Sequence, residues 1–299
     1  MNKRTLLNLS LLVIVLVLIG VVVFAPEEEP VKAPPLTELK KTDIVRIDVS
    51  RPEQPSILLE KNAEQWEMIE PYNVTANNFK VEALLGLVET PSHAQYPLQD
   101  GDKVKFGFDK PLAWVNFNDE LTIAFGNSEP ISNNRYVLIG DQLHLITDTF
   151  YYQLGVKAHT LVDHGLLPRN AKLQELALPD MTLSFVTGAW IVEPKQAHDS
   201  TDSAIQLIDE WRNSQAVSVA PLEKTPAQKT ITAKFRAGPA IRFELRHTDS
   251  GIILARPDIG LQYTLSKDAA DRLLKLPEPP DTATTTNAPA EPTPQQPAP

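Results

Sequence analysis

A short element that occurs twice in the chain constrains its fold more than any other feature. Residues 65–71 read QWEMIEP and residues 189–194 read AWIVEP, so each copy places a tryptophan before apolar residues and a Glu-Pro pair. Trp66 and Trp190 lie 124 residues apart, and the helical patterns that follow the two copies lie 123 residues apart. A chain that repeats strand, proline and helix at one spacing is expected to contain two copies of one unit.

The pattern around each copy extends this prediction. Alternating apolar and polar residues, typical of half-buried strands, precede each copy, and an amphipathic helix pattern follows it. The apolar face of the first helix holds Val81, Leu84, Leu85 and Val88, and that of the second holds Ala204, Leu207, Ile208 and Trp211. The strands expected before the two helices are IVRIDVS, SILLEK and QWEMIE in the first half, and KLQELAL, MTLSFVT and AWIVEP in the second. Four more strands and a helix are expected to end each half: LAWVNFN, LTIAFG, RYVLIG and QLHLIT, then KTITAKFR, AIRFELRH, GIILAR and LQYTLS.

The sequence therefore predicts an α+β fold with a transmembrane helix and two duplicated halves, each roughly βββα and then ββββα, with mainly antiparallel sheets. The expected division is a cytoplasmic tip and membrane anchor (1–24), a Pro/Glu-rich spacer (25–41), two periplasmic halves (42–168 and 169–276) and a tail (277–299). The prolines of the spacer predict a stiff, extended segment. The tail is rich in Pro, Thr, Ala and Gln, and it has too little apolar bulk to offset its ordering entropy, so it is expected to be disordered.

The repeated residues themselves are expected to be structural anchors. Each tryptophan is expected to hold its strand against the following helix, and each proline to end the strand because it cannot donate to the ladder. A paired ligand-stacking site is the alternative interpretation of the tryptophans. The anchor residues are Trp66, Glu70, Pro71, Trp190, Glu193 and Pro194.

The N-terminus indicates a membrane anchor. Thr5–Phe24 is an uncharged run of 20 residues, which as a helix spans about 30 Å, the thickness of the hydrocarbon layer. A cleaved signal peptide is the alternative, but its apolar region is usually shorter, and Pro26 follows the one plausible cleavage point. Lys3 and Arg4 precede the run and three glutamates follow it, so we expect a single-pass protein of a bacterial inner membrane, with its N-terminus cytoplasmic and its bulk periplasmic.

Composition and motifs argue against several functions. The formal net charge is −10, which makes nucleic acid a poor partner, and the absence of cysteine excludes disulfides and thiolate metal sites. No HExxH, GxSxG, GxGxxG or phosphate-loop pattern occurs, so we expect no catalytic residue, no metal and no cofactor. His159, Asp163 and His164 are the nearest approach to a cluster, and they are expected to lie on an exposed turn that ends at Pro168. A hydrolase whose site is assembled only in space is the remaining enzymatic alternative.

Two aromatic stretches are candidates for contact surfaces. The first is FGFDKPLAWVNF, residues 106–117. The second holds Phe150, Tyr151 and Tyr152, three consecutive aromatics, which is more than one helix face can bury. At least one of them is expected to point away from the local core. We favour packing on the other half over contact with another protein.

Several of these elements together resemble a bacterial family of unknown function. The matching features are the N-terminal anchor, the Trp…Glu-Pro element with its helix, the stretch FGFDKP and the stretch RYVLIGDQLHLI; Phe108 stands where that family usually has leucine. The resemblance covers about residues 42–276. It implies a repeated periplasmic domain, often encoded beside an ABC-2 type exporter with gliding-motility-like components, and no established catalytic residues. We therefore expect a non-catalytic accessory protein of an ABC-type envelope transport complex, with inner-membrane lipid and a membrane protein as partners. A binding module for an envelope glycan or lipid, using a groove between the halves, is the alternative.

Overall fold

A computed structural model of the chain describes residues 3–24, 33–195 and 199–277. Helix α1 runs over Lys3–Phe24, and its described side chains are Lys3, Arg4 and residues 7–20. In the part of the chain that the structure describes, no helix is both long enough and apolar enough to cross a membrane. Most of the predicted spacer, residues 25–32, and the predicted tail from residue 278 lie outside the described residues.

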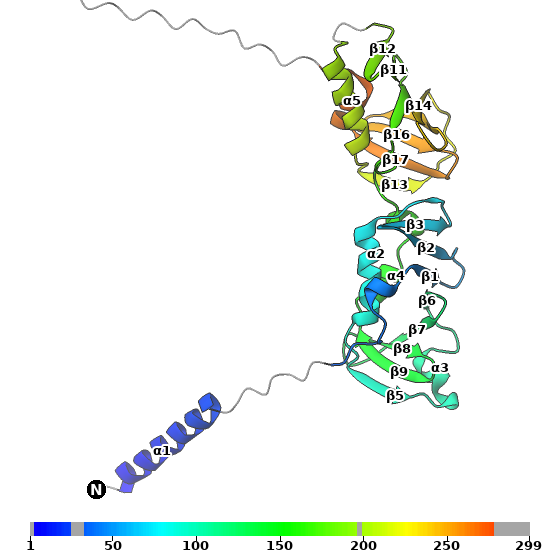
Figure 1. Ribbon diagram of the computed structural model, residues 1–299. Helices are drawn as coiled ribbons and strands as arrows, with labels where there is room; N and C mark the ends of the chain where they lie inside the picture. The colour runs from blue at the N-terminus through cyan, green and yellow to red at the C-terminus, as the bar shows by residue number, and fades with distance from the viewer. Residues whose placement is uncertain (1–2, 25–32, 196–198, 278–299) are drawn as a thin grey trace, which may run out of the picture.

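Two antiparallel sheets, one beyond the other along the chain, form the body of the protein (Figure 1). This confirms an α+β fold with mainly antiparallel sheets. The nine-stranded sheet contains β1 (Arg46–Ser50), β2 (Ile57–Asn62), β3 (Gln65–Glu70), β4 (Val74–Thr75), β5 (Ala94–Pro97), β6 (Ala113–Phe117), β7 (Leu121–Ser128), β8 (Asn134–Ile139) and β9 (Gln142–Thr147). The eight-stranded sheet contains β10 (Leu173–Ala177), β11 (Thr182–Val186), β12 (Ala189–Glu193), β13 (Ser218–Pro221), β14 (Lys229–Phe235), β15 (Ile241–Thr248), β16 (Gly251–Arg256) and β17 (Leu261–Ser266).

The strand orders of the two sheets correspond. The first order is β4-β3-β2-β1-β6-β7-β8-β9-β5, and the second is β12-β11-β10-β14-β15-β16-β17-β13. Once the two-residue strand β4 is set aside, each strand of the first sheet has a counterpart in the second. Strands β5 and β13 are absent from the expected order, and each follows the long helix of its half and pairs at the far edge, with β9 and with β17 respectively.

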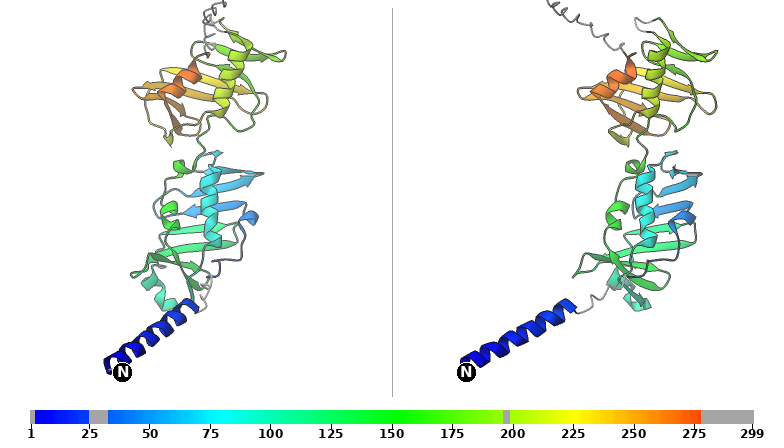
Figure 2. Two further views of the ribbon diagram at one scale, coloured as in Figure 1. Left: turned by 90° about the vertical axis from the view of Figure 1, so that its left-hand side faces the viewer. Right: turned by 60° about the vertical axis from the view of Figure 1, so that its left-hand side comes forward.

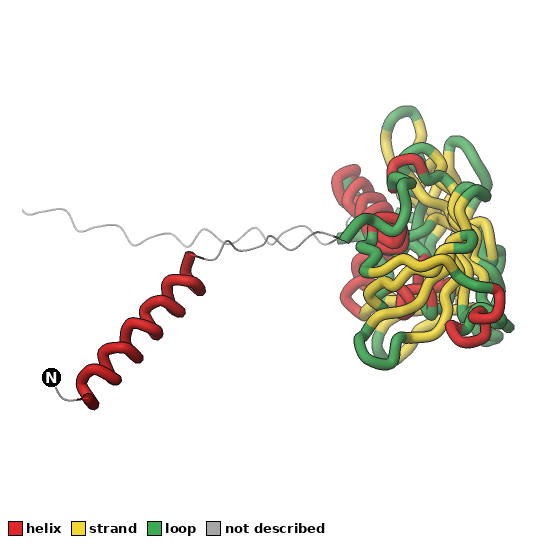
Figure 3. The backbone as a smooth tube through the Cα atoms, turned by 90° about the horizontal axis from the view of Figure 1, so that it is seen from below, coloured by secondary structure: helices red, strands yellow, loops and turns green. Residues whose placement is uncertain are grey.

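The helices of the body are α2 (Asn78–Leu85), α3 (Lys103–Phe106), α4 (Phe150–Leu154), α5 (Thr201–Asn213) and α6 (Lys267–Leu274), with 3₁₀ turns η1 (Lys41–Asp43), η2 (Gly86–Glu89), η3 (Asp100–Asp102) and η4 (Ala158–Leu161). The longer helices α2 and α5, together with α4 and α6, cover the same side of the two sheets, whereas the short helix α3 lies on the opposite side of the first sheet (Figures 1, 2 and 3). The expected apolar faces of α2–η2 and of α5 are buried. Asn77 caps α2 by accepting a hydrogen bond from the Lys80 N–H, and Ser200 caps α5 in the same way through the Ser203 N–H.

The two repeated elements differ by one residue because β3 carries a bulge. Leu58 pairs with Glu70 and Leu59 with Met68, so Ile69 has no partner of its own on β2. This extra residue explains why the tryptophans are offset by 124 positions and the prolines by 123. The peptide bonds before Pro71 and Pro194 are both cis.

Burial also separates the two tryptophans. Trp66 is 1 % exposed and belongs to the central apolar cluster, whereas Trp190 is only partly buried and packs edge-to-face on Phe185 with ring centroids 5.4 Å apart. The two tryptophans occupy equivalent places, opposite Lys61 and Phe185 respectively. Trp190 is nevertheless less buried than Trp66, because β12 is the edge strand of its sheet.

The stretch FGFDKP packs across the sheet face opposite the helices. Phe106 and Phe108 belong to a small second apolar cluster, and a Cβ on Gly126 would collide with the Phe106 carbonyl oxygen. Gly107, at φ +82°, would likewise place a Cβ 2.6 Å from the Asn127 side chain. The stretch therefore closes one face of the first sheet.

Residues 33–41 contact the first half. Leu36 is buried, its N–H donates to the Thr90 carbonyl oxygen, and the Thr37 N–H donates to that of Val88. The Ser92 N–H donates to the Pro34 carbonyl oxygen. Residues 34–37 of the predicted spacer are therefore docked on the first half and do not form part of a free, extended segment.

Candidate functional site

One extended segment joins the two sheets. Near its start, Val162 forms a bridge with Ala76, and the Asp163 N–H donates to the Thr75 carbonyl oxygen. Three residues after Val162, Gly165 forms a bridge with Gln215 in the second half. The segment Leu161–Gly165 therefore pairs with the first half at one end and with the second half at the other.

Apolar side chains fix this joining segment in place. Leu161, Val162, Leu166 and Leu167 are all buried in the central apolar cluster, which extends through both halves. In addition, η4 lies against the edge strand β13. The junction is thus a packed contact between the halves, and side chains of both halves surround it.

A groove of about 540 Å³ lies at this junction, and we name it the junction groove. Residues 67 and 73–75 line it from the first half, and residues of β14–β17 line it from the second. The volume falls in the range of about 300–1,000 Å³ that is usual for small-molecule sites. Its polar lining residues include Asp163, Arg169, Arg212, Arg256 and Tyr263, and its apolar ones include Phe235, Pro239 and Ile241.

Asp163 is the central acidic group of the junction groove. It is buried, and its carboxylate accepts hydrogen bonds from the Gly165 N–H (2.8 Å) and from Arg169 Nη2 (2.8 Å). The expectation of an exposed turn at this position is therefore wrong for Asp163. A carboxylate has about four lone-pair sites, so these two bonds leave it free to accept more.

Tyr263 reaches the junction groove from β17. The side chain is 2 % exposed, and its hydroxyl makes no hydrogen bond with any residue that the structure describes. Burial raises the pKa of Tyr263 to about 12, with the nearby Asp163 and Asp258 charges adding to the rise and Arg256 opposing it. The phenol is therefore protonated at neutral pH and offers a hydrogen-bond donor.

Of the two histidines near Asp163, His164 has a structural contact and His159 is a partly buried group beside two lysines. His164 Nδ1 lies 2.9 Å from the Ala216 carbonyl oxygen, and the Ala216 N–H donates to the His164 carbonyl oxygen. Burial lowers the pKa of His159, and the charges of Lys157 and Lys80 lower it further. Across the described residues, no group of three or more His, Asp or Glu side chains is arranged to hold a metal ion.

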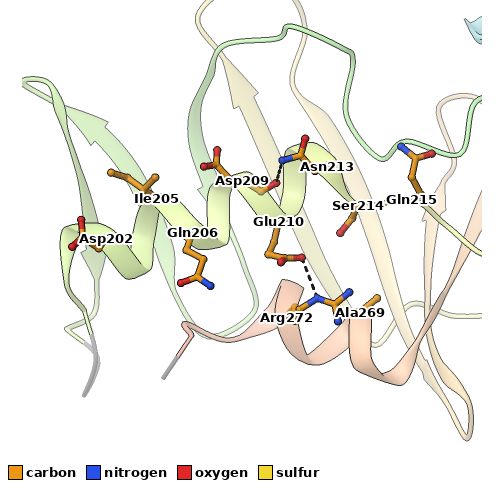
Figure 4. Close-up of a pocket in the computed structure, with 10 residues that line it drawn as sticks. All are labelled: Asp202, Ile205, Gln206, Asp209, Glu210, Asn213, Ser214, Gln215, Ala269 and Arg272. Carbon is orange, nitrogen blue, oxygen red and sulfur yellow. Dashed lines mark hydrogen bonds and ion pairs between the residues drawn. The ribbon is translucent and has the colours of Figure 1, made fainter. Parts of the chain in front are cut away.

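A second cavity, of about 600 Å³, lies between α5 and α6 (Figure 4). It is a shallow surface depression whose acidic residues Asp202, Asp209 and Glu210 lie along α5, and Glu210 is bridged to Arg272 of α6 at 3.1 Å. We favour the junction groove as the functional site because it is more enclosed, joins both halves and contains buried polar groups.

The aromatic residues of α4 contact their own half. Phe150 packs on the core beside Gly86, and Tyr151 lies under the Arg135 guanidinium, whose Cζ is 3.9 Å from the ring centroid. Tyr152 is 72 % exposed and points away from the core, as expected for one of the three. The structure does not place the three residues on the other half, which was the favoured interpretation.

Arg135 forms a buried ion pair with Asp148. Arg135 Nε and Nη2 donate to the two carboxylate oxygens of Asp148 at 2.6 and 2.7 Å. Arg135 also donates to the Gly126 carbonyl oxygen and to the Ser128 hydroxyl. Through these hydrogen bonds and the stacking of Arg135 on Tyr151, the ion pair links β8, β7 and α4. The Asp148 carboxylate is bound to Arg135 through both oxygens, so we assign the pair a structural role.

The architecture defines an α+β protein with two corresponding antiparallel sheets and a groove at their junction. Residues 66–188 match a family model described as a domain of unknown function, DUF4340. The match starts at Trp66 and ends at Gly188, so it crosses the junction from β3 to the β11–β12 hairpin. No curated protein matches the chain. No solved structure matches it either.

Proposed function

We propose that this chain is a non-catalytic, membrane-anchored accessory protein that acts outside the cytoplasm, as a component of an ABC-type envelope transport complex. The uncharged run Thr5–Phe24, with basic residues only before it, supports the anchor and its orientation. The resemblance described above supports the transport complex. The corresponding strand orders support a duplicated unit, which would offer a partner two similar faces.

The observation that carries the proposal is the short connection between helix α1, which ends at Phe24, and the first half, on which the chain is docked from Pro34 onward. The body begins to pack at Pro34, so nine residues separate it from Phe24, in place of the 17 of the predicted spacer. Even as an extended polyproline segment, nine residues span at most about 28 Å. A tether this short would hold the first half near the membrane surface, where a membrane-protein partner would meet it.

A release experiment tests this function. Replacing Met1–Phe24 with a cleavable signal sequence should abolish complementation of a deletion strain, although the released body still folds and accumulates. A second variant, Leu36→Ser, should loosen the docked segment and reduce complementation while leaving the protein in the membrane fraction. Glu38→Gln, at an exposed position two residues away, is the matched control and should have no effect.

The opposite outcome would favour an enzyme. A hydrolase that acts on a diffusible substrate keeps most of its activity when it is released from the membrane. Full complementation by the released body would therefore refute the accessory function.

The junction groove supports a second candidate function, a binding module for an envelope glycan or lipid. The specific observation is a cavity of small-molecule size at the contact between the halves, with apolar walls and several polar groups. Binding and an accessory role are compatible, because a transport accessory can bind the transported or anchored molecule.

A further inference from the structure

We propose that the junction groove binds a neutral saccharide, with the Tyr263 hydroxyl donating a hydrogen bond to it and the Asp163 carboxylate accepting one from it. This inference rests on the second candidate function and chooses between its two ligand classes.

The first step is the unpartnered hydroxyl of Tyr263. Polar groups on the wall of a groove are normally paired with protein or water. The Tyr263 hydroxyl is not among the fully enclosed side-chain atoms that lack a partner, so it opens onto the groove. Tyr263 is 2 % exposed, lines the groove and has no partner among the described residues. A ligand oxygen in the groove would accept a hydrogen bond from this hydroxyl in place of solvent.

The second step is the remaining capacity of Asp163. Its two hydrogen bonds come from the Gly165 N–H and from Arg169, so the carboxylate is held in one orientation before any ligand arrives. Sugar hydroxyls donate and accept at the same time. A polyhydroxyl ligand can therefore satisfy the carboxylate as a donor and the phenol as an acceptor.

The third step is charge, which separates a neutral sugar from an anionic headgroup. Each arginine of the groove already has a carboxylate partner: Arg169 with Asp163, Arg212 with Asp209, and Arg256 with Asp258. An incoming phosphate would find each arginine charge already balanced by a carboxylate, and it would also be repelled by the Asp163 charge. A neutral ligand meets neither cost.

The walls of the groove complete the fit. Phe235 and Ile241 come from β14 and β15, and Pro239 lies in the turn between them. A sugar ring has apolar C–H faces, and an aromatic ring presents a negative face to such groups. The charged side chains that line the groove, Glu67 from the first half among them, make it unsuited to an acyl chain.

The test uses the full-length chain in a detergent without a sugar headgroup. Maltotriose and chitotriose serve as neutral probes, and glycerol phosphate serves as the anionic probe. Saturation-transfer NMR should detect at least one neutral probe at millimolar concentrations and give no signal for glycerol phosphate.

Matched tyrosine variants locate the binding. Tyr263→Phe removes a hydroxyl that makes no hydrogen bond within the described protein, so the melting temperature should be unchanged while probe affinity falls about threefold to tenfold, as for the loss of one hydrogen bond. Tyr152→Phe, at an exposed position outside the groove, should leave the affinity unchanged. Arg169→Gln, which frees one Asp163 oxygen, should change affinity without unfolding the chain.

Three results would overturn the inference: no binding of either neutral probe, preferential binding of glycerol phosphate, or equal affinities of wild type and Tyr263→Phe. If saccharide binding fails while complementation still requires the membrane anchor, the inference falls and the accessory function stands.

Discussion

Replacing the two repeated tryptophans tests the difference in their burial. Trp66 is 1 % exposed within the central apolar cluster, so Trp66→Ala leaves a large cavity and should cost about 3–5 kcal/mol. Its indole N–H has no hydrogen-bond partner in the described structure, so this cost comes from packing alone. Trp190 is only partly buried and packs on Phe185 and on the edge of the central apolar cluster, so Trp190→Ala should cost less, about 1–2 kcal/mol.

Denaturant unfolding followed by far-UV circular dichroism measures both costs. In thermal melts, Trp66→Ala should lower Tm by roughly 6–20 °C for a body of this size. Because the halves need not unfold together, each variant should be followed by fluorescence of the remaining tryptophans as well. Trp66→Phe is the matched control and should recover most of the stability. Equal costs for the two alanine variants would refute the argument from burial.

Three further variants probe single contacts. Asp148→Asn leaves the Arg135 charge buried without its partner and should cost about 3–5 kcal/mol in denaturant unfolding; an unchanged midpoint would contradict a buried pair. Gly126→Ala forces a methyl group against the Phe106 carbonyl oxygen, and the loss of stability in thermal melts should far exceed that of the exposed Gly101→Ala, whose new methyl group meets nothing. Burial lowers the pKa of His144, so as pH falls the unfolded state takes up this proton before the folded state does. The free energy of unfolding should therefore be full above about pH 6.5 and decrease as pH falls below that value. In unfolding curves measured over a pH series, His144→Gln should weaken this dependence of stability on pH.

The sequence predicted the central strands because their apolar periodicity is strong. It missed β5 and β13, which read AQYP and SVAP, because each has four residues, shows little alternation and ends in proline. Proline argues against a strand, but at an edge its missing N–H costs nothing. The bulge at Ile69 was also missed. The only signal for it in the sequence was that the tryptophans are offset by 124 residues and the prolines by 123.

The candidate site was harder to predict than the fold. Asp163 stood out in the sequence, but its neighbours Arg256 and Tyr263 come from strands about 100 residues later in the chain. Their proximity depends on how the second sheet meets the joining segment, and no local pattern encodes that contact. Similarly, FGFDKP stood out as aromatic, but only the close approach of Gly126 shows that it closes a sheet face.

The segment Leu161–Gly165 also determines how mechanical load would cross the molecule. If the N-terminus is held at a membrane and a partner pulls on the second half, the force passes through this segment. Backbone hydrogen bonds lie across the direction of an extended segment, so a pull along it loads them in shear, side by side, instead of opening them one at a time. The joint should therefore resist tension better than its few residues suggest, and it should yield abruptly when the bonds fail together.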